Sequence, residues 1–112
     1  MIELCWPAKQ LSPNFRGHWS RKAKAAKLAR QVAGWNTKAS GVKVSGEGLI
    51  DLHITFHPPD KRRRDLDNCI ASMKSLLDGV ADGLCVNDSR FRLHLEFGEV
   101  VNGGKVVVKI NQ

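Results

Sequence analysis

Four short stretches of the chain have the apolar content and spacing of β-strands. The clearest alternation runs from Ile50 to Phe56, where every second residue is apolar and the residues between them are mostly polar. Pro58 and Pro59 follow this stretch and end it. The turn signal NGGK at residues 102–105 predicts that the last two strands form an antiparallel hairpin. The predicted strands are residues 2–6, 49–57, 92–101 and 105–110.

Two stretches have the apolar spacing of amphipathic helices. The first runs from Trp19 to Trp35, is rich in alanine, lysine and arginine, and has Ser20 as a candidate N-cap. The second runs from Asp67 to Val80. The stripe expected to face the core consists of Ala25, Leu28, Ala29, Val32 and Trp35 in the first helix, and of Ile70, Met73, Leu77 and Val80 in the second.

This order of elements predicts an α/β fold in a single domain, residues 1–112. Strand, helix, strand, helix, strand, strand is the pattern of a small mixed sheet of about four strands packed with two main helices. The length fits one compact domain. Trp6, Trp19 and Trp35 are expected to lie in the core, because a small domain depends on its large side chains for packing.

Positive charge is concentrated in the first part of the chain. The net charge is +7, and residues 1–44 hold nine of the 18 lysines and arginines but one acidic residue, Glu3. Such a basic segment is typical of a protein with a polyanionic partner, most often a nucleic acid. A solvated basic surface with no partner is the alternative.

The remaining composition narrows the class of protein. Cys5, Cys69 and Cys85 are scattered and form no CxxC pair, which favours free thiols over a disulfide framework or a zinc site. No apolar run approaches the roughly 20 residues of a membrane-spanning helix. The first ten residues, MIELCWPAKQ, lack the pattern of a secretory signal peptide. We therefore expect a cytoplasmic protein without a membrane partner.

The most unusual stretch is KRRRDLDN, residues 61–68, where four cations run directly into two aspartates. In an extended chain the side chains of Asp65 and Asp67 project to the same side. Asp67 could simply cap the following helix, but this leaves Asp65 and the cations unexplained. Carboxylate oxygens are preferred ligands of Mg²⁺, and substrate phosphate commonly completes its shell. Asp88, in the turn VNDS, is a candidate third ligand.

Lys74 is a candidate catalytic residue of the second helix. Asp67, Ala71, Lys74 and Asp78 are spaced four, three and four residues apart and would share one helix face. A lysine on this face could contact a scissile phosphate or stabilise the leaving oxygen. An exposed ion pair with Asp78 is the alternative role.

The run RRRDLDN, followed by a helix and an acidic turn, resembles the RusA family of Holliday junction resolvases, which is common in phages and prophages. The N-terminal strand, the loop with SPN and the basic helix fit as well, so the resemblance covers nearly the whole chain. It implies a homodimer that uses Mg²⁺, with Mn²⁺ as a substitute, and no organic cofactor. It also implies paired symmetric nicks in four-way DNA junctions during recombination and repair.

The resemblance also implies roles for individual residues. Asp65, Asp67 and Asp88 match the metal-binding and catalytic aspartates, and Arg64 matches the basic residue before the first of them. The family's lysine stands four residues after the second aspartate, where this chain has Ala71, so Lys74 is assigned the catalytic role. The residues expected to contact DNA are Asn14, Arg16, Arg21, Lys24, Lys61, Arg62, Arg63 and Arg64.

Two other functions are kept beside a junction-resolving endonuclease. A protein that binds junctions or branched DNA with weak or lost nuclease activity is favoured by Asn87, which stands where the family often has a second aspartate. A basic RNA-binding module is less well supported, because no RNP or KH signature is present. His57, at the end of a strand near the motif, could also reach the site.

Overall fold

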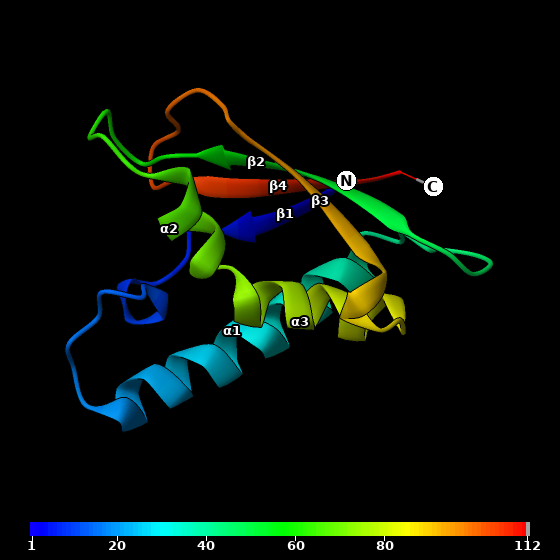
Figure 1. Cartoon of the computed structure of the whole chain (residues 1–112), viewed down its shortest axis with the longest axis horizontal. Helices are drawn as coiled ribbons and strands as arrows, with labels where there is room; N and C mark the ends of the chain where they lie inside the picture. Colours follow the sequence, from blue (N-terminus) through cyan, green and yellow to red (C-terminus); the bar gives the residue numbers. More distant parts are fainter. Residues whose placement is uncertain (112) are drawn as a thin grey trace.

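A computed structural model describes residues 1–111 as one four-stranded sheet with helices on one of its faces (Figure 1). The strands are β1 (Ile2–Cys5), β2 (Ile50–His57), β3 (Phe91–Phe97) and β4 (Lys105–Asn111). The helices are α1 (Trp19–Ala39), α2 (Leu66–Ala71) and α3 (Lys74–Leu84), with single 3₁₀ turns at η1 (Lys9–Leu11) and η2 (Asp88–Arg90). The predicted mixed α/β architecture and element order are confirmed.

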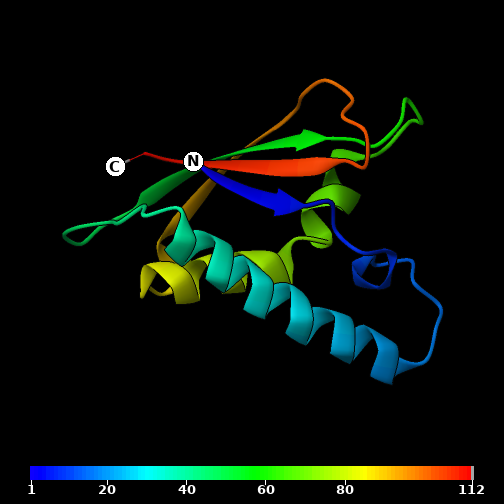
Figure 2. The same ribbon diagram turned by 180° about the vertical axis from the view of Figure 1, so that it is seen from behind.

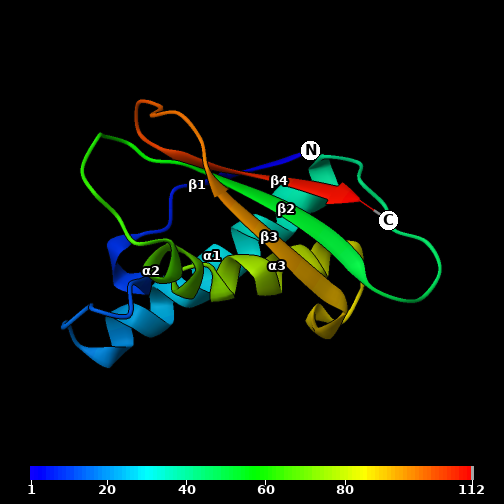
Figure 3. The same ribbon diagram turned by 45° about the horizontal axis from the view of Figure 1, so that its top comes forward.

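The order of strands across the sheet is β1-β4-β2-β3. β4 pairs antiparallel with both β1 and β2, whereas β2 and β3 are parallel. The parallel pair is visible in Figure 3, where β3 lies along the outer edge of β2. The predicted hairpin between the last two strands is therefore wrong. β4 carries the continuous apolar run Val106–Val108, which is buried, and such a run suits a central strand rather than an edge.

The core lies between the sheet and the helices α1 and α3, which pack on the same face (Figure 2). The predicted alternation of β2 is confirmed, because Ile50, Leu52, Ile54 and Phe56 are fully buried. Met73 and Val80 of the second predicted helix are also fully buried, and Ile70 and Leu77 pack against the core.

The second predicted helix is divided into α2 and α3 by a turn at Ser72 and Met73. Ser72 Oγ donates a hydrogen bond to the Asn68 carbonyl oxygen at 3.0 Å, a contact within the helix that commonly accompanies bending. Asp67 and Lys74 therefore belong to different helices, and the single face predicted from Asp67 to Asp78 does not exist.

The first helix is longer than predicted and turns a different side toward the core. Its N-cap is His18, whose side chain accepts the Ser20 N–H, rather than Ser20 itself. It packs on α3 through small residues, with Ala33, Gly34 and Thr37 buried. Trp19 and Trp35 are 75% and 59% exposed, so the prediction that all three tryptophans lie in the core is wrong for these two.

No helix within residues 1–111 combines the length and the apolar character needed to cross a membrane. The three cysteines are free thiols. The expectation of buried or half-buried thiols holds for Cys69 but is wrong for Cys5 and Cys85, because both are exposed.

Candidate functional site

The basic stretch forms a loop that is fixed by its own hydrogen bonds. After β2 ends, Asp60 accepts the backbone N–H of Arg62 at 2.9 Å and the Nη1 of Arg64 at 2.8 Å. Arg64 Nη1 also donates to the Arg62 carbonyl oxygen at 3.0 Å. The hydrogen bond from Arg64, followed by that from Arg62, lowers the pKa of Asp60 below its usual value. The loop that carries the cations therefore has a defined shape.

Arg64 differs from the other cations of this loop. Its guanidinium lies 5.5 Å from the ring centre of Trp6, and its side chain is only 15% exposed. Trp6 in turn packs edge-on against Phe56 of the core, with ring centres 6.2 Å apart. Arg64 thus joins the loop to the core, whereas Lys61, Arg62 and Arg63 are exposed.

Asp65 occupies the N-cap position of α2, but its carboxylate does not cap the helix. Within residues 1–111 the carboxylate makes no hydrogen bond or ion pair. Asp65 lines a cleft of about 680 Å³. Arg62, Arg63 and Arg64 line the same cleft. Asp65, whose carboxylate has no partner within residues 1–111, therefore lines the same cleft as three arginines. The cleft also includes Trp6, Ser12, Asn14, Asn68 and Ser72.

Asp67 is exposed, stands in the first turn of α2, and is not among the residues that line this cleft. Its Oδ1 accepts the backbone N–H of Asn68 at 3.0 Å. The expectation that Asp65 and Asp67 project to the same side assumed an extended chain through both residues. Asp65 has an extended backbone, but Leu66 and Asp67 are already helical, so this assumption does not hold.

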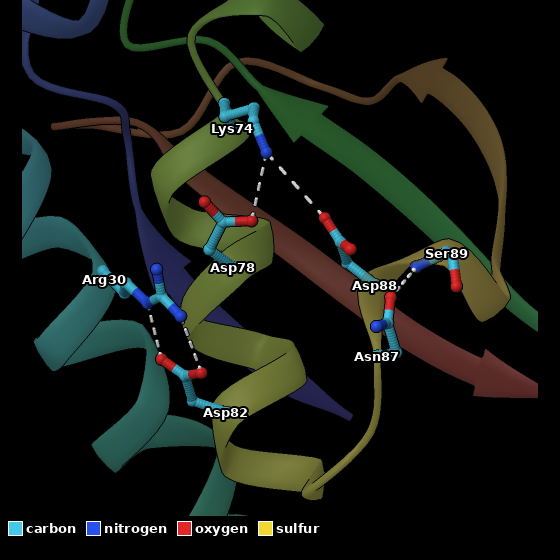
Figure 4. A network of polar contacts seen from close by, with 7 residues as sticks. All are labelled: Arg30, Lys74, Asp78, Asp82, Asn87, Asp88 and Ser89. Atoms are coloured by element: carbon cyan, nitrogen blue, oxygen red, sulfur yellow. Dashed lines mark hydrogen bonds and ion pairs between the residues drawn. The ribbon is translucent and has the colours of Figure 1, made fainter.

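Lys74 and Asp88 form a second polar cluster, together with Asp78 (Figure 4). Lys74 Nζ lies 3.3 Å from Asp78 Oδ1 and 3.8 Å from Asp88 Oδ2. All three residues line a small hollow of about 140 Å³ that also includes Leu77, Phe91 and Leu93. Asn87 points its side chain elsewhere, accepting the Ser89 N–H at 2.9 Å. Lys74 therefore pairs with two carboxylates. Its ion pair with Asp78 is the alternative to a catalytic role that the sequence also indicated.

The carboxylates assigned to the metal have the correct chemistry but are not brought together. Among residues 1–111, no group of three or more histidine, cysteine, aspartate or glutamate side chains is placed to hold a metal ion. Asp65 lines the large cleft and Asp88 lines the small hollow beside Lys74. Within this chain, the residues do not fit a three-carboxylate metal centre.

The other residues predicted to contact DNA are exposed but lie in different places. Asn14 lines the large cleft with the arginines. Arg21 and Lys24 line a separate groove along α1, and Arg16 lies in the loop before that helix. His57 Nδ1 contacts the Glu99 carbonyl oxygen at 2.9 Å, and His57 is not among the residues that line the large cleft.

Several residues of the large cleft were not predicted as functional, among them Trp6, Lys9 and Asn68. Trp6 was assigned only to the core, although it also forms part of the cleft wall. Asn68 lines the cleft and ends the KRRRDLDN stretch, so its place in the motif was the available signal. Nothing in the sequence pattern indicated that Trp6 would meet Arg64, which stands far along the chain beyond η1, α1 and β2.

The fold and the cleft together define a small α/β domain with a basic, carboxylate-containing cleft at the end of its sheet. No family model matches the chain. The chain is 44% identical over 117 aligned positions to a protein of Xylella fastidiosa (strain Temecula1) described as "Uncharacterized protein", and the match covers 97% of this chain and 74% of the relative. The chain belongs to the same family as this protein.

Proposed function

We propose that the protein is a structure-selective endodeoxyribonuclease of the RusA type that resolves four-way DNA junctions. The observation that carries this proposal is the cleft lined both by Asp65, which has no partner within residues 1–111, and by Arg62, Arg63 and Arg64. Arginines attract DNA phosphates, while a carboxylate without a partner is available for chemistry. A protein that only binds DNA has less reason to place a free carboxylate among its cations.

The residues of the cleft suggest a division of roles. The exposed Arg62 and Arg63 would contact phosphates, and Arg64 would hold the loop in position through Trp6 and Asp60. The side-chain amides of Asn14 and Asn68 can donate hydrogen bonds to phosphate or sugar oxygens. Together these groups would position one DNA strand beside Asp65.

Magnesium is part of the proposal, with manganese as a substitute. The role of Asp65, Asp67 and Asp88 as ligands of this ion is what the resemblance implies, since these carboxylates do not form one group within residues 1–111. Lys74 would add positive charge near Asp88.

The protein would act as a homodimer, because resolution of a four-way junction into two duplexes requires two symmetric nicks. One chain carries one cleft of this kind, and two copies related by a two-fold axis match the symmetry of the junction. The apolar residues of the first and last two predicted strands are the candidates that the sequence offers for the dimer contact: Ile2, Leu4, Trp6, Val100, Val106 and Val108. Ile2, Leu4, Val106 and Val108 are buried within the chain, whereas Val100 is 42% exposed.

The second candidate is a protein that binds branched DNA with weak or lost nuclease activity. Two observations favour it: the three aspartates do not form one group, and Lys74 is paired with Asp78 and Asp88. A protein with this function would need the arginines of the cleft to bind DNA phosphates, but it would not need the aspartates.

Incubation with a labelled four-way junction, with and without Mg²⁺, tests both candidates. We expect paired nicks at symmetric positions only with Mg²⁺ or Mn²⁺, and no cleavage of a linear duplex of the same sequence. Tight binding to the junction without cleavage under either metal would support the second candidate. Failure to prefer the junction over the duplex would overturn both.

A further inference from the structure

The apolar stripe predicted for the first helix is present, but the chain leaves much of it uncovered. α1 packs on α3 through Ala33, Gly34 and Thr37, whereas Leu28 remains 60% exposed. In Figure 2 the N-terminal half of α1 extends beyond the end of α3. An apolar stripe on a surface helix normally faces a partner, and within residues 1–111 this one lacks a complete cover.

The uncovered stripe forms one wall of an apolar groove. The groove has a volume of about 540 Å³, within the range of about 300–1,000 Å³ that is usual for ligand sites. The segment between β1 and η1 forms the other wall. Leu4 and Leu11, both buried, and Leu76 of α3 contribute side chains to the groove. The groove could therefore take up one or two large apolar side chains.

The charge around the groove narrows the choice of occupant. Arg21 and Lys24 line it, and no aspartate or glutamate of residues 1–111 does so. α1 as a whole carries six cations and no anion. A second copy packed through α1 would bring the same positive charge against it, which is unfavourable. DNA would suit the two cations but would leave the apolar walls in contact with water.

We propose that this groove binds a short segment of a partner protein, with large apolar side chains inside the groove and acidic residues beside Arg21 and Lys24. Apolar anchors that enter a groove, flanked by complementary charge, are a recurrent mode of peptide recognition. The groove is distinct from the cleft at Asp65, since their shared residues are limited to Trp6, Pro7 and Ala8 of the connecting segment. The proposal adds a protein partner to the proposed nuclease and does not depend on its activity.

Selection from a random peptide library displayed on phage tests this proposal. Selection would use the wild-type protein, with counter-selection against Leu28→Glu. Leu28 is largely exposed, so this substitution leaves the core intact. We expect enrichment of peptides that combine large apolar residues with aspartate or glutamate.

Fluorescence anisotropy then measures the affinity of an enriched peptide for each variant. Leu28→Glu should lower this affinity about tenfold or more, and Lys24→Glu about fivefold. The matched control Lys27→Glu changes a cation of the same helix that does not line the groove, and should stay within about twofold.

Four results would overturn the proposal. One is the absence of any enriched peptide that distinguishes wild type from Leu28→Glu. A second is equal binding after the apolar residues of the peptide are replaced by serine, which would reduce the interaction to charge alone. A third is an equal loss of junction DNA affinity in Leu28→Glu, which would make the groove a DNA surface. The fourth is a wild-type dimer that becomes a monomer in Leu28→Glu, which would make the groove an interface between copies of this chain.

Discussion

At the scale of single residues, the aspartates of the motif differ in their surroundings. Asp65 lines the basic cleft and has no partner among residues 1–111, Asp67 accepts a backbone N–H, and Asp88 lies near Lys74. The sequence could predict that Asp65 and Asp67 stand next to a basic loop, because that follows from their order in the chain. It could not predict which carboxylate would be unpaired, because this depends on where the helix begins and on contacts between distant segments.

The first prediction concerns substitution of these aspartates. Asp65→Asn, Asp67→Asn and Asp88→Asn should each abolish cleavage of a four-way junction, while binding stays equal or becomes tighter. Loss of a negative charge removes a ligand or reactive group but also reduces repulsion of the DNA phosphates. Cleavage assays and gel-shift titrations measure the two effects separately. Glu47→Gln, an exposed residue far from the motif in the chain, is the control. Weakened binding in all three variants would indicate a role in folding instead.

The second prediction concerns acid sensitivity. On the helix-free face of the sheet, Asp51 accepts hydrogen bonds from Arg92, at 3.0 Å to Nη2, and contacts His94 Nε2 at 3.0 Å. The Arg92 contact, followed by that of His94, lowers the pKa of Asp51 far below the usual 3.8. A carboxyl group whose pKa is lower in the folded than in the unfolded protein stabilises the fold at pH values above the unfolded-state pKa. This stabilisation is lost as the pH falls below about 4.

Urea denaturation at pH 6 and pH 3 checks this expectation. Wild type should lose more stability over this interval than Asp51→Asn, in which the titrating group is absent. Asp82→Asn should act in the same direction, because Arg30 lowers the pKa of Asp82 through a hydrogen bond of 2.7 Å. An identical loss in wild type and in both variants would contradict the assignment.

At the scale of elements, glycines decide how closely the two long helices approach. A Cβ added to Gly79 of α3 would collide with the Arg30 carbonyl oxygen and lie 2.7 Å from Ala33 Cβ. A Cβ added to Gly83 would lie 2.6 Å from Thr37 Cβ. A Cβ at Gly34 would meet the Gly79 carbonyl oxygen at 3.4 Å, which is close to ordinary contact.

The third prediction follows from this order of distances. In an exposed helix, replacement of glycine by alanine stabilises by about 1 kcal/mol. Gly79→Ala and Gly83→Ala should instead destabilise by about 1–3 kcal/mol, because the helices must move apart. Gly34→Ala is the matched control on the facing helix and should have the smallest effect. Chemical denaturation ranks the three variants, and equal stabilisation by all of them would show that the helices are not so close.

The pattern of each element was predictable where a single face is buried, as in β2. The pairing of strands was not, because β3 and β4 are neighbours in sequence with a turn signal between them, yet β4 inserts between β1 and β2. The feature that agrees with a central position of β4 is the apolar run Val106–Val108, which is buried and fits a strand with a neighbour on each side. Similarly, the stripe on α1 had the spacing of a core face, but small residues allow a different face to pack on α3.

At the scale of the whole molecule, the charge distribution should govern DNA affinity. The fourth prediction is that junction binding weakens steeply with salt, since counterions are released as the protein neutralises phosphates. Arg62→Ala combined with Arg63→Ala should flatten this dependence, with a change of about 0.9 in the slope for each phosphate that the variant no longer neutralises. Arg64 is kept in this variant, because its interactions with Trp6 and Asp60 maintain the loop. Lys43→Ala, an exposed cation outside the cleft, should leave the slope unchanged. If the double variant has the same slope as wild type, the loop does not contact DNA phosphates and the prediction is wrong.

The fifth prediction is that the protein forms a two-fold dimer at micromolar concentration. The burial of β1 and β4 leaves the edge strand β3 and the segment after it as an uncovered apolar strip, with Leu93, Phe97 and Val100 each about 40% exposed. A strip of this kind on an edge strand favours contact with another chain. Sedimentation should give a dimer for wild type and a monomer for Phe97→Asp. Leu49→Asp changes a side chain that is also exposed but lies outside the strip, and this variant should remain dimeric.

If the wild-type protein is a monomer that makes single nicks, a flap or branch nuclease is favoured over a resolvase. If a strict monomer makes paired nicks, the symmetry argument fails.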